Sequence, residues 1–249
     1  MDLPSDLATV LSSAQSAMDR SGKSCQVIEA VTVGRDMNGI FVYEAACATG
    51  DGYLVVADFP ADAVACAALG DGIGDRERDW DTDVVDECKL PGNSLTPARI
   101  ADYAQQAGVH CAIGDAVQIG RNNGGAVFEV GCGAGEAFWI QREAETWTRV
   151  SCLKVTGQGG ACRFSTPTDQ AALLTVRLSD APTPCEVSQT AYVGSNGADD
   201  YFEAVCASGS GLMLKLDADA RVQQSWPCER AASIGGGCTL TRTAAAARN

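Results

Sequence analysis

The sequence predicts an α+β protein made of three tandem disulfide-stapled repeats, each a helix followed by a three- or four-stranded antiparallel sheet. One stretch occurs three times, at residues 25–47, 111–132 and 185–206, with a cysteine at both ends and two β-prone arms around a turn rich in Gly and Asn. Helically spaced apolar residues precede each copy, and another apolar run follows it. The cysteine spacing also recurs. The expected repeats cover 3–92, 93–166 and 167–243, with a tail over 244–249.

A helix is expected at the start of each repeat. Apolar residues recur at helical spacing over 7–18 after a Ser5 cap, and over 100–107 after Pro97 at the first helical position. The third helix is expected from Thr168 onward. A trefoil-like barrel is the architectural alternative, although trefoil units are shorter and lack a leading helix.

The repeated stretch is expected to form a hairpin whose terminal cysteines face each other. That register would pair the following residues: Glu29 with Tyr43, Asp115 with Phe128, and Gln189 with Phe202. In a regular strand, the polar member of each pair would share a face with apolar residues. A β-bulge that turns it outward is the favoured explanation, and a polar spot on a buried face is the alternative.

Twelve cysteines in 249 residues predict a disulfide framework formed in an oxidising compartment, whether periplasmic, secreted or at the cell surface. The threefold repetition pairs the first cysteine of each unit with the second, and the third with the fourth. The expected bridges are Cys25–Cys47, Cys66–Cys88, Cys111–Cys132, Cys152–Cys162, Cys185–Cys206 and Cys228–Cys238.

Composition and charge restrict the function. The net charge of −14 disfavours nucleic acids and anionic lipid surfaces as partners. The sequence contains no run of 18 apolar residues, so no transmembrane segment is expected. The first residues lack a basic segment followed by an apolar run, so no signal peptide is visible, and a mature chain with an added Met is expected.

The acidic segment 67–87, between the third and fourth cysteines, is read as an insertion in the first repeat. Its residues Asp79, Trp80, Asp81 and Asp83 are candidates for binding a protein partner, with the tryptophan as an apolar anchor. The alternative is that this tryptophan only packs the loop onto the body. Calcium is a second possibility, with this set of candidate ligands: Asp79, Asp81, Asp83 and Asp86. No other cofactor is expected.

Glu44, Glu129 and Glu203 recur at one position in the second arm of the hairpin. Three such carboxylates could form a cation-binding ring if the repeats packed with threefold symmetry. The favoured interpretation is an outward strand position, paired or solvated, one step from an aromatic core residue.

Enzymatic motifs are not evident, so the protein is expected not to be an enzyme. His110 is the single histidine, and it precedes Cys111 at a hairpin entrance without a nucleophile motif nearby. The smallest cysteine spacing is ten residues, which argues against zinc ribbons, thioredoxin-type sites and c-type haem. A glycosidase-type carboxylate pair is not singled out by any stretch.

The order of helix, hairpin and third strand, with an aromatic-Glu-apolar step at 43–45, 128–130 and 202–204, resembles the PepSY and β-lactamase-inhibitor-like class of extracytoplasmic modules. The resemblance covers about 50 residues of each unit, and the disulfides depart from the pattern of that class. It implies binding or inhibition of other proteins through a sheet face, without catalysis.

The function expected from the sequence is non-enzymatic binding or assembly with other proteins outside the cytoplasm, as a structural or accessory subunit of a membrane or cell-surface complex. The alternatives are an inhibitor of a secreted or periplasmic enzyme and a calcium-dependent structural protein.

Overall fold

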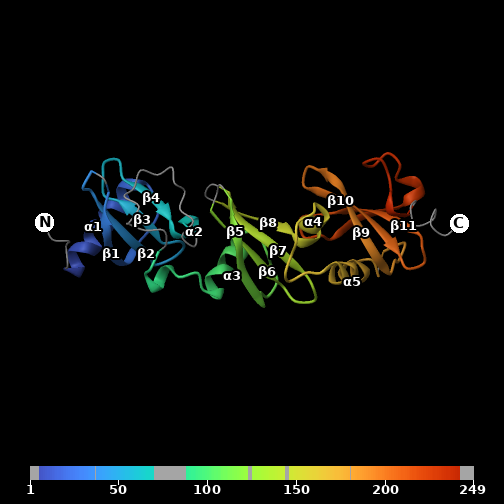
Figure 1. Cartoon of the computed structure of the whole chain (residues 1–249), viewed down its shortest axis with the longest axis horizontal. Coiled ribbons are helices and arrows are strands. Elements are labelled where there is room, and N and C mark those ends of the chain that lie inside the picture. The colour runs from blue at the N-terminus through green and yellow to red at the C-terminus, as the bar shows by residue number, and fades with distance from the viewer. Residues whose placement is uncertain are drawn as a thin grey trace. The chain divides into compact units, whose positions relative to one another are not determined.

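The structure, a computed structural model of the whole chain, describes residues 6–36, 38–69, 88–122, 125–143, 146–179 and 181–241. Over these ranges the protein is α+β, with three antiparallel four-stranded sheets (Figure 1). Residue contacts divide the chain into two compact units. The first comprises Met1–Thr96 with Gly120–Ala126 and Arg142–Ala144, and the second comprises Pro97–Ile119, Val127–Gln141 and Glu145–Asn249. The division into three repeats remains a prediction.

The first sheet has the strand order β1-β2-β3-β4. Its elements are α1 (Leu7–Ser21), β1 (Val27–Arg35), β2 (Phe41–Cys47), β3 (Tyr53–Val56), β4 (Asp62–Ala65) and the short helix α2 (Cys66–Leu69). Asp6 caps α1, because its side chain accepts a hydrogen bond from the Thr9 backbone N–H at 2.9 Å. Ser5, the expected cap, lies outside the described residues. The helix buries Ala14 and Met18 in a core shared with one face of this sheet.

The second sheet has the order β5-β6-β7-β8. Its elements are α3 (Pro97–Gln106), β5 (Asp115–Asn122), β6 (Gly125–Gly131), β7 (Ala137–Glu143), β8 (Thr146–Ser151) and α4 (Cys152–Gly157). The preceding turn η1 (Pro91–Asn93) belongs to the first sheet, where Asn93 donates a hydrogen bond to Glu44. Pro97 begins α3 as predicted. Tyr103 of this helix stacks on Trp147, with ring centroids 4.3 Å apart, and both rings lie close to Phe128 in the core.

The third sheet has the order β12-β11-β10-β9. Its elements are α5 (Pro167–Arg177), β9 (Val187–Asn196), β10 (Asp199–Cys206), β11 (Gly211–Leu216), β12 (Val222–Pro227) and η2 (Cys228–Arg230). The α5 helix begins at Pro167, one residue earlier than predicted. Thr166 and Asp169 form a reciprocal capping box at its start, which accounts for the earlier boundary.

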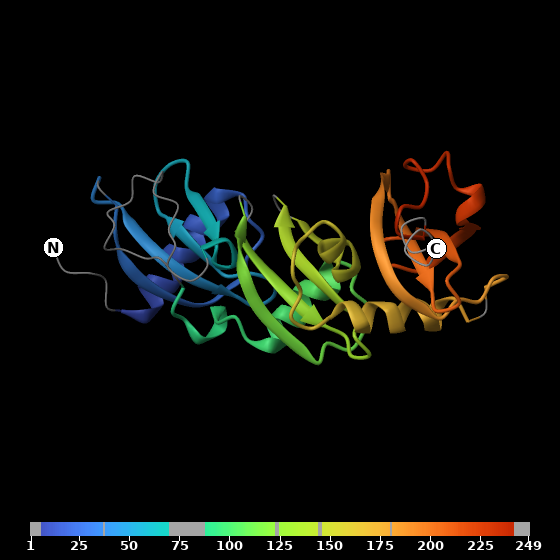
Figure 2. The same cartoon turned by 45° about the vertical axis from the view of Figure 1, so that its right-hand side comes forward.

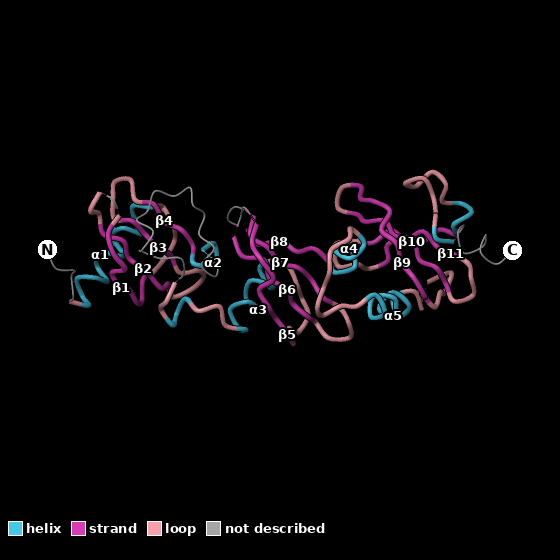
Figure 3. The backbone as a smooth tube through the Cα atoms, in the orientation of Figure 1, coloured by secondary structure: helices cyan, strands magenta, loops and turns pink. Residues whose placement is uncertain are grey.

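The helices are less regular than a strict helix-first repeat predicts. α1 has 15 residues, α3 has 10 and α5 has 11, and further short helical turns follow each sheet. The tube in Figure 3 shows these turns in cyan beside the magenta strands. The prediction of one helix and one sheet per repeat therefore holds only in part.

The hairpin register differs from the predicted one. In two hairpins the second cysteine of the stretch pairs with the residue two positions after the first cysteine, as Cys47 with Val27 and Cys206 with Val187. Bulges next to these pairs shift the remaining register further. Consequently Tyr43 faces Thr32 and Phe202 faces Tyr192, not the polar residues that were expected. The three polar residues are nevertheless exposed: Glu29, Asp115 and Gln189.

All twelve cysteines are paired, and the six bridges are those that the repeated spacing predicts. One bridge of each sheet closes the first hairpin. The other begins after the fourth strand, where a short helical turn starts. Figure 2 shows the backbone from a second side. No helix of the described residues is long and apolar enough to cross a membrane.

Candidate protein-binding site

The residues singled out in the acidic insertion lie outside the described part of the chain. They are Asp79, Trp80, Asp81, Asp83 and Asp86. Partner binding and calcium binding by this segment therefore remain predictions. His110, which is described, is exposed at the start of the β5 hairpin.

The recurring glutamates are fully buried, which corrects the interpretation of an outward position. Glu44, Glu129 and Glu203 each have an exposed fraction of 0%. They point to the sheet face away from the aromatic core residue that precedes them, but this face is covered by chain that follows the second disulfide. The alternation predicts the correct face for these glutamates, and the burial of that face is what differs from the prediction.

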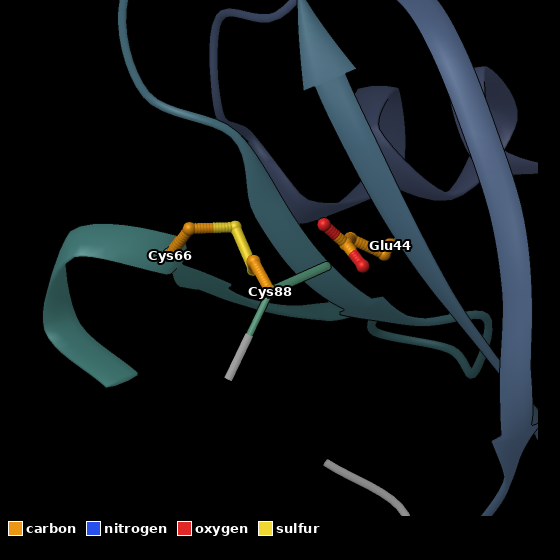
Figure 4. Close-up of side chains that lie close together, drawn as sticks. All are labelled: Glu44, Cys66 and Cys88. Carbon is orange, nitrogen blue, oxygen red and sulfur yellow. A yellow bond between two sulfur atoms is a disulfide. The ribbon is translucent and has the colours of Figure 1, made fainter. Parts of the chain in front are cut away.

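Each buried glutamate accepts hydrogen bonds from the backbone just after a cysteine. Glu44 accepts from Lys89 N at 2.9 Å and Leu90 N at 2.7 Å, the first two residues after Cys88. In Figure 4 the Glu44 carboxylate lies beside the Cys66–Cys88 bridge. We call this arrangement the carboxylate latch.

The latch recurs in the other two sheets. Glu129 Oε1 accepts from the N–H groups of Arg163 and Phe164, both at 2.6 Å. Glu203 accepts from three consecutive N–H groups at 2.6–2.9 Å, those of Thr239, Leu240 and Thr241. A negative charge that is desolvated in this way is stabilised by charge-assisted hydrogen bonds, so the latch holds the covering segment on its sheet.

The three latches are not equivalent. Both oxygens of Glu203 accept hydrogen bonds, whereas Glu129 Oε2 is buried and has no partner among the described residues. Trp139 is paired directly with Glu129 in the sheet. Its Nε1 is also buried and has no hydrogen-bond partner among the described residues. Burial by itself raises the pKa of Glu203, but the hydrogen bonds from Thr241, Leu240 and Thr239 outweigh it and hold that pKa below its ordinary value.

The chemistry of the latches does not suit a metal ion. In each sheet the glutamate and two cysteines place ligand-type atoms within 4.8 Å of one another. Both sulfurs, however, are consumed in a disulfide, and a metal would require thiolates. The glutamate oxygens already accept backbone N–H groups. The donor set therefore fits a structural latch and not a metal centre.

A second recurring feature is the short helical turn that begins at the first cysteine of the latch disulfide. We call it the knuckle, and its three copies are Cys66–Leu69, Cys152–Gly157 and Cys228–Arg230. Two of the knuckles contact the first hairpin of the following sheet. We call each of these contacts a knuckle joint.

The knuckle joint of the second unit places α4 on the β9–β10 hairpin. Lys154 Nζ donates to Asp200 Oδ1 at 2.7 Å and to Ser195 Oγ at 3.1 Å. A Cβ added to Gly157 would lie 2.5 Å from the Tyr192 Cβ, so glycine permits the close approach of the two elements. The adjacent Leu153 belongs to the hydrophobic core of the third sheet. This joint combines apolar packing with one partly buried ion pair.

The knuckle joint of the first unit places α2 on the β5–β6 hairpin. Arg121 Nη2 donates a hydrogen bond to the Ala68 carbonyl oxygen at the end of the knuckle. Gly125 again permits close contact, since an added Cβ would lie 2.8 Å from the Ala68 Cα. Arg142 and Asp51 form a buried ion pair at 3.0 Å in the same unit. Cationic side chains therefore cross from one sheet to the next at both joints, Arg121 and Arg142 at the first and Lys154 at the second.

Sequence reasoning missed the knuckles because their residues share no side-chain motif. The segment after the first cysteine reads CAAL, CLKVTG and CER in the three copies. The available signal was position: Arg35, Arg121 and Ser195 all stand ten residues after the first cysteine of their hairpin. Two of these three contact the preceding knuckle.

Comparisons with known proteins identify no relative of this chain. No family model, no curated protein and no solved structure matches it. The resemblance to PepSY and β-lactamase-inhibitor-like modules therefore gains no support from them and remains a sequence-based expectation.

Proposed function

We propose that the chain is a non-enzymatic, extracytoplasmic protein that binds or assembles with other proteins. In this proposal it consists of three tandem helix-first repeats, 3–92, 93–166 and 167–243. The single observation that carries the proposal is the knuckle joint, because the same contact between one sheet's closing turn and the next sheet's first hairpin occurs twice. A module that recognises a copy of itself within one chain has the surface chemistry needed to recognise another chain.

The hydrogen bonding of the three recurring glutamates supports a structural role for these carboxylates. An enzyme places titratable residues where substrate can reach them. Here the three glutamates that recur are buried and hydrogen-bonded to backbone N–H groups. Their recurrence is thus explained by folding, and it gives no reason to assign catalysis to them.

The disulfides and the charge indicate the surroundings. Six disulfides fit an oxidising environment, as in secreted or periplasmic proteins. The net charge of −14 favours partners with basic surfaces.

The test is isolation of the protein from its source under mild conditions after brief chemical cross-linking, with identification of bound proteins by mass spectrometry. We expect one or a few proteins in stoichiometric amount. A stoichiometric complex with a single enzyme whose activity falls on binding would instead establish inhibition. Recovery of the chain alone, cross-linked neither to another protein nor to a second copy of itself, would refute the proposal.

A further inference from the structure

The two knuckle joints leave one hairpin and one knuckle without a counterpart. The β5–β6 and β9–β10 hairpins each receive a knuckle, and the knuckles of the first and second sheets are used. Among the described residues, the β1–β2 hairpin receives no knuckle, and Cys228–Arg230 contacts no following sheet. The chain therefore presents both halves of the same kind of contact, one on its first sheet and one on its third.

The β1–β2 hairpin carries an unsatisfied donor at the joint position. Arg35 Nη1 donates to the Gly39 carbonyl oxygen at 2.7 Å, and its guanidinium carbon lies 3.8 Å from the centre of the Phe41 ring. Its Nη2 is buried and has no hydrogen-bond partner within the described ranges. The equivalent atom of Arg121 donates to a knuckle carbonyl oxygen. A buried donor without an acceptor is costly, so the guanidinium of Arg35 is stabilised if it turns outward to an acceptor on another chain.

A second unsatisfied atom lies on the same hairpin. Thr32 Oγ1 is buried without a partner in the described part of the chain. Thr32 is equivalent in position to Tyr192, since each lies seven residues after the first cysteine of its hairpin. Tyr192 is the residue on which Gly157 packs. Two polar atoms that lack partners thus coincide with positions that contact a knuckle in another sheet.

The free knuckle is complementary to this hairpin in charge. Glu229 and Arg230 are exposed on the knuckle of the third sheet, and Arg35 and Asp36 are adjacent on the β1–β2 hairpin. Arg230 stands two residues after its cysteine, as Lys154 does, and Lys154 contacts an acidic side chain and a hydroxyl at its joint. Opposite charges at both positions favour pairing of Glu229 with Arg35 and of Arg230 with Asp36.

From these observations we infer that the β1–β2 hairpin binds the third knuckle of a second copy of this chain, so that copies associate head to tail. The contact is heterologous, because each copy uses two different surfaces. The Arg35 side chain turns outward in this contact and gains the acceptor that it lacks in the single chain. This inference rests on the proposed assembly function and names a partner for it.

The test is sedimentation velocity of the full-length chain with its disulfides intact, over a concentration series. We expect the average sedimentation coefficient to rise with concentration for the wild-type protein. Arg35→Glu alone and Glu229→Arg alone each place like charges together, and each should weaken association about tenfold or more. Glu186→Arg, an equal charge change at another exposed residue, is the matched control and should leave association unchanged.

Mixing the two weakened variants supplies a readout that a folding defect cannot imitate. In the mixture, the hairpin of Arg35→Glu can bind the knuckle of Glu229→Arg, because opposite charges again face each other. The hairpin of Glu229→Arg can bind the knuckle of Arg35→Glu through the wild-type pair. Association should therefore return. A wild-type protein that stays monomeric throughout the series would overturn the inference. Association that neither variant weakens, or that the mixture does not restore, would overturn it too.

The inference and the proposed function fail in different ways. A monomeric chain that still recovers a stoichiometric partner from its source, with Arg35→Glu and Glu229→Arg recovering it equally well, refutes head-to-tail association and leaves the assembly function in place. A chain that neither self-associates nor recovers any partner refutes both.

Discussion

Replacing Glu203 by Gln tests the carboxylate latch directly. The side chain is fully buried, with Oε2 accepting from Thr239 N at 2.6 Å and Leu240 N at 2.9 Å. Its Oε1 accepts from the Thr241 N–H and hydroxyl, both at 2.7 Å. Glutamine keeps one acceptor oxygen and turns the other into a donor. Whichever orientation the amide takes, at least one backbone N–H is left facing another donor.

The size of the effect follows from the number of bonds lost. A hydrogen bond to a charged group contributes about 1.5–3 kcal/mol, and an unpaired buried donor adds a desolvation cost of similar size. The best glutamine orientation loses the charge and one N–H contact, so we expect a loss of about 3 kcal/mol. Because 1.4 kcal/mol corresponds to a factor of ten, local opening should increase on the order of 100-fold.

Hydrogen exchange of peptides that contain residues 239–241 is the appropriate assay, measured at neutral pH with the disulfides intact. A single free energy of unfolding is poorly defined for a chain with two compact units, whereas exchange reports local opening. Glu129→Gln is the matched control, since Glu129 Oε2 has no partner among the described residues and an amide nitrogen can take its place. Exchange at 163–164 should rise less than tenfold.

Two results would refute the reasoning. If exchange at 239–241 is unchanged in Glu203→Gln, the carboxylate does not hold this segment. If Glu129→Gln opens its own segment as strongly as Glu203→Gln does, the number of accepted hydrogen bonds does not determine the strength of the latch.

Three further predictions concern the same features. The pKa of Glu203 is held below its ordinary value of 4.5, so the contribution of this carboxylate to stability is complete above that pH and is lost as pH falls through the folded-state pKa. The melting temperatures of wild type and Glu203→Gln should therefore converge in acid. A difference in melting temperature that stays constant with pH would contradict the prediction. Replacing Cys228 and Cys238 together by Ser removes a bridge across a separation of 10 residues and should cost about 3 kcal/mol. It should also be non-additive with Glu203→Gln in exchange measurements, because both changes release one segment. Gly157→Ala should loosen the joint by about 1–3 kcal/mol through overpacking, seen as faster exchange in β9, whereas Gly120→Ala, with nothing within 4 Å of an added Cβ, should not.

The candidate site was only partly predictable. The threefold recurrence of the glutamate was visible in the sequence, and its alternation with the aromatic core residue placed it on the correct side of the strand. Its burial was not visible, because the donors to Glu203 lie 36–38 residues further along the chain. A local pattern of alternation reports which face a residue occupies, but it does not report what covers that face.

The knuckle joint was beyond sequence reasoning for a related reason. Ala68 contributes a backbone carbonyl oxygen and Lys154 contributes an ammonium group, at the same position after the cysteine. A contact that depends on the backbone can keep its place while its side chains change. Only the geometry of two neighbouring sheets shows that the two contacts are the same.

The sequence by itself determined the α+β class, the recurring hairpins and the six disulfide pairs, because each depends on short-range periodicity or on spacing that repeats within the chain. It also indicated the bulges that turn Glu29 and Gln189 outward. Tertiary structure decided the strand register, the burial of the three carboxylates and the use of the knuckles. Those features depend on contacts between segments that are distant in sequence, where an inserted bulge residue or a covering loop changes which groups meet.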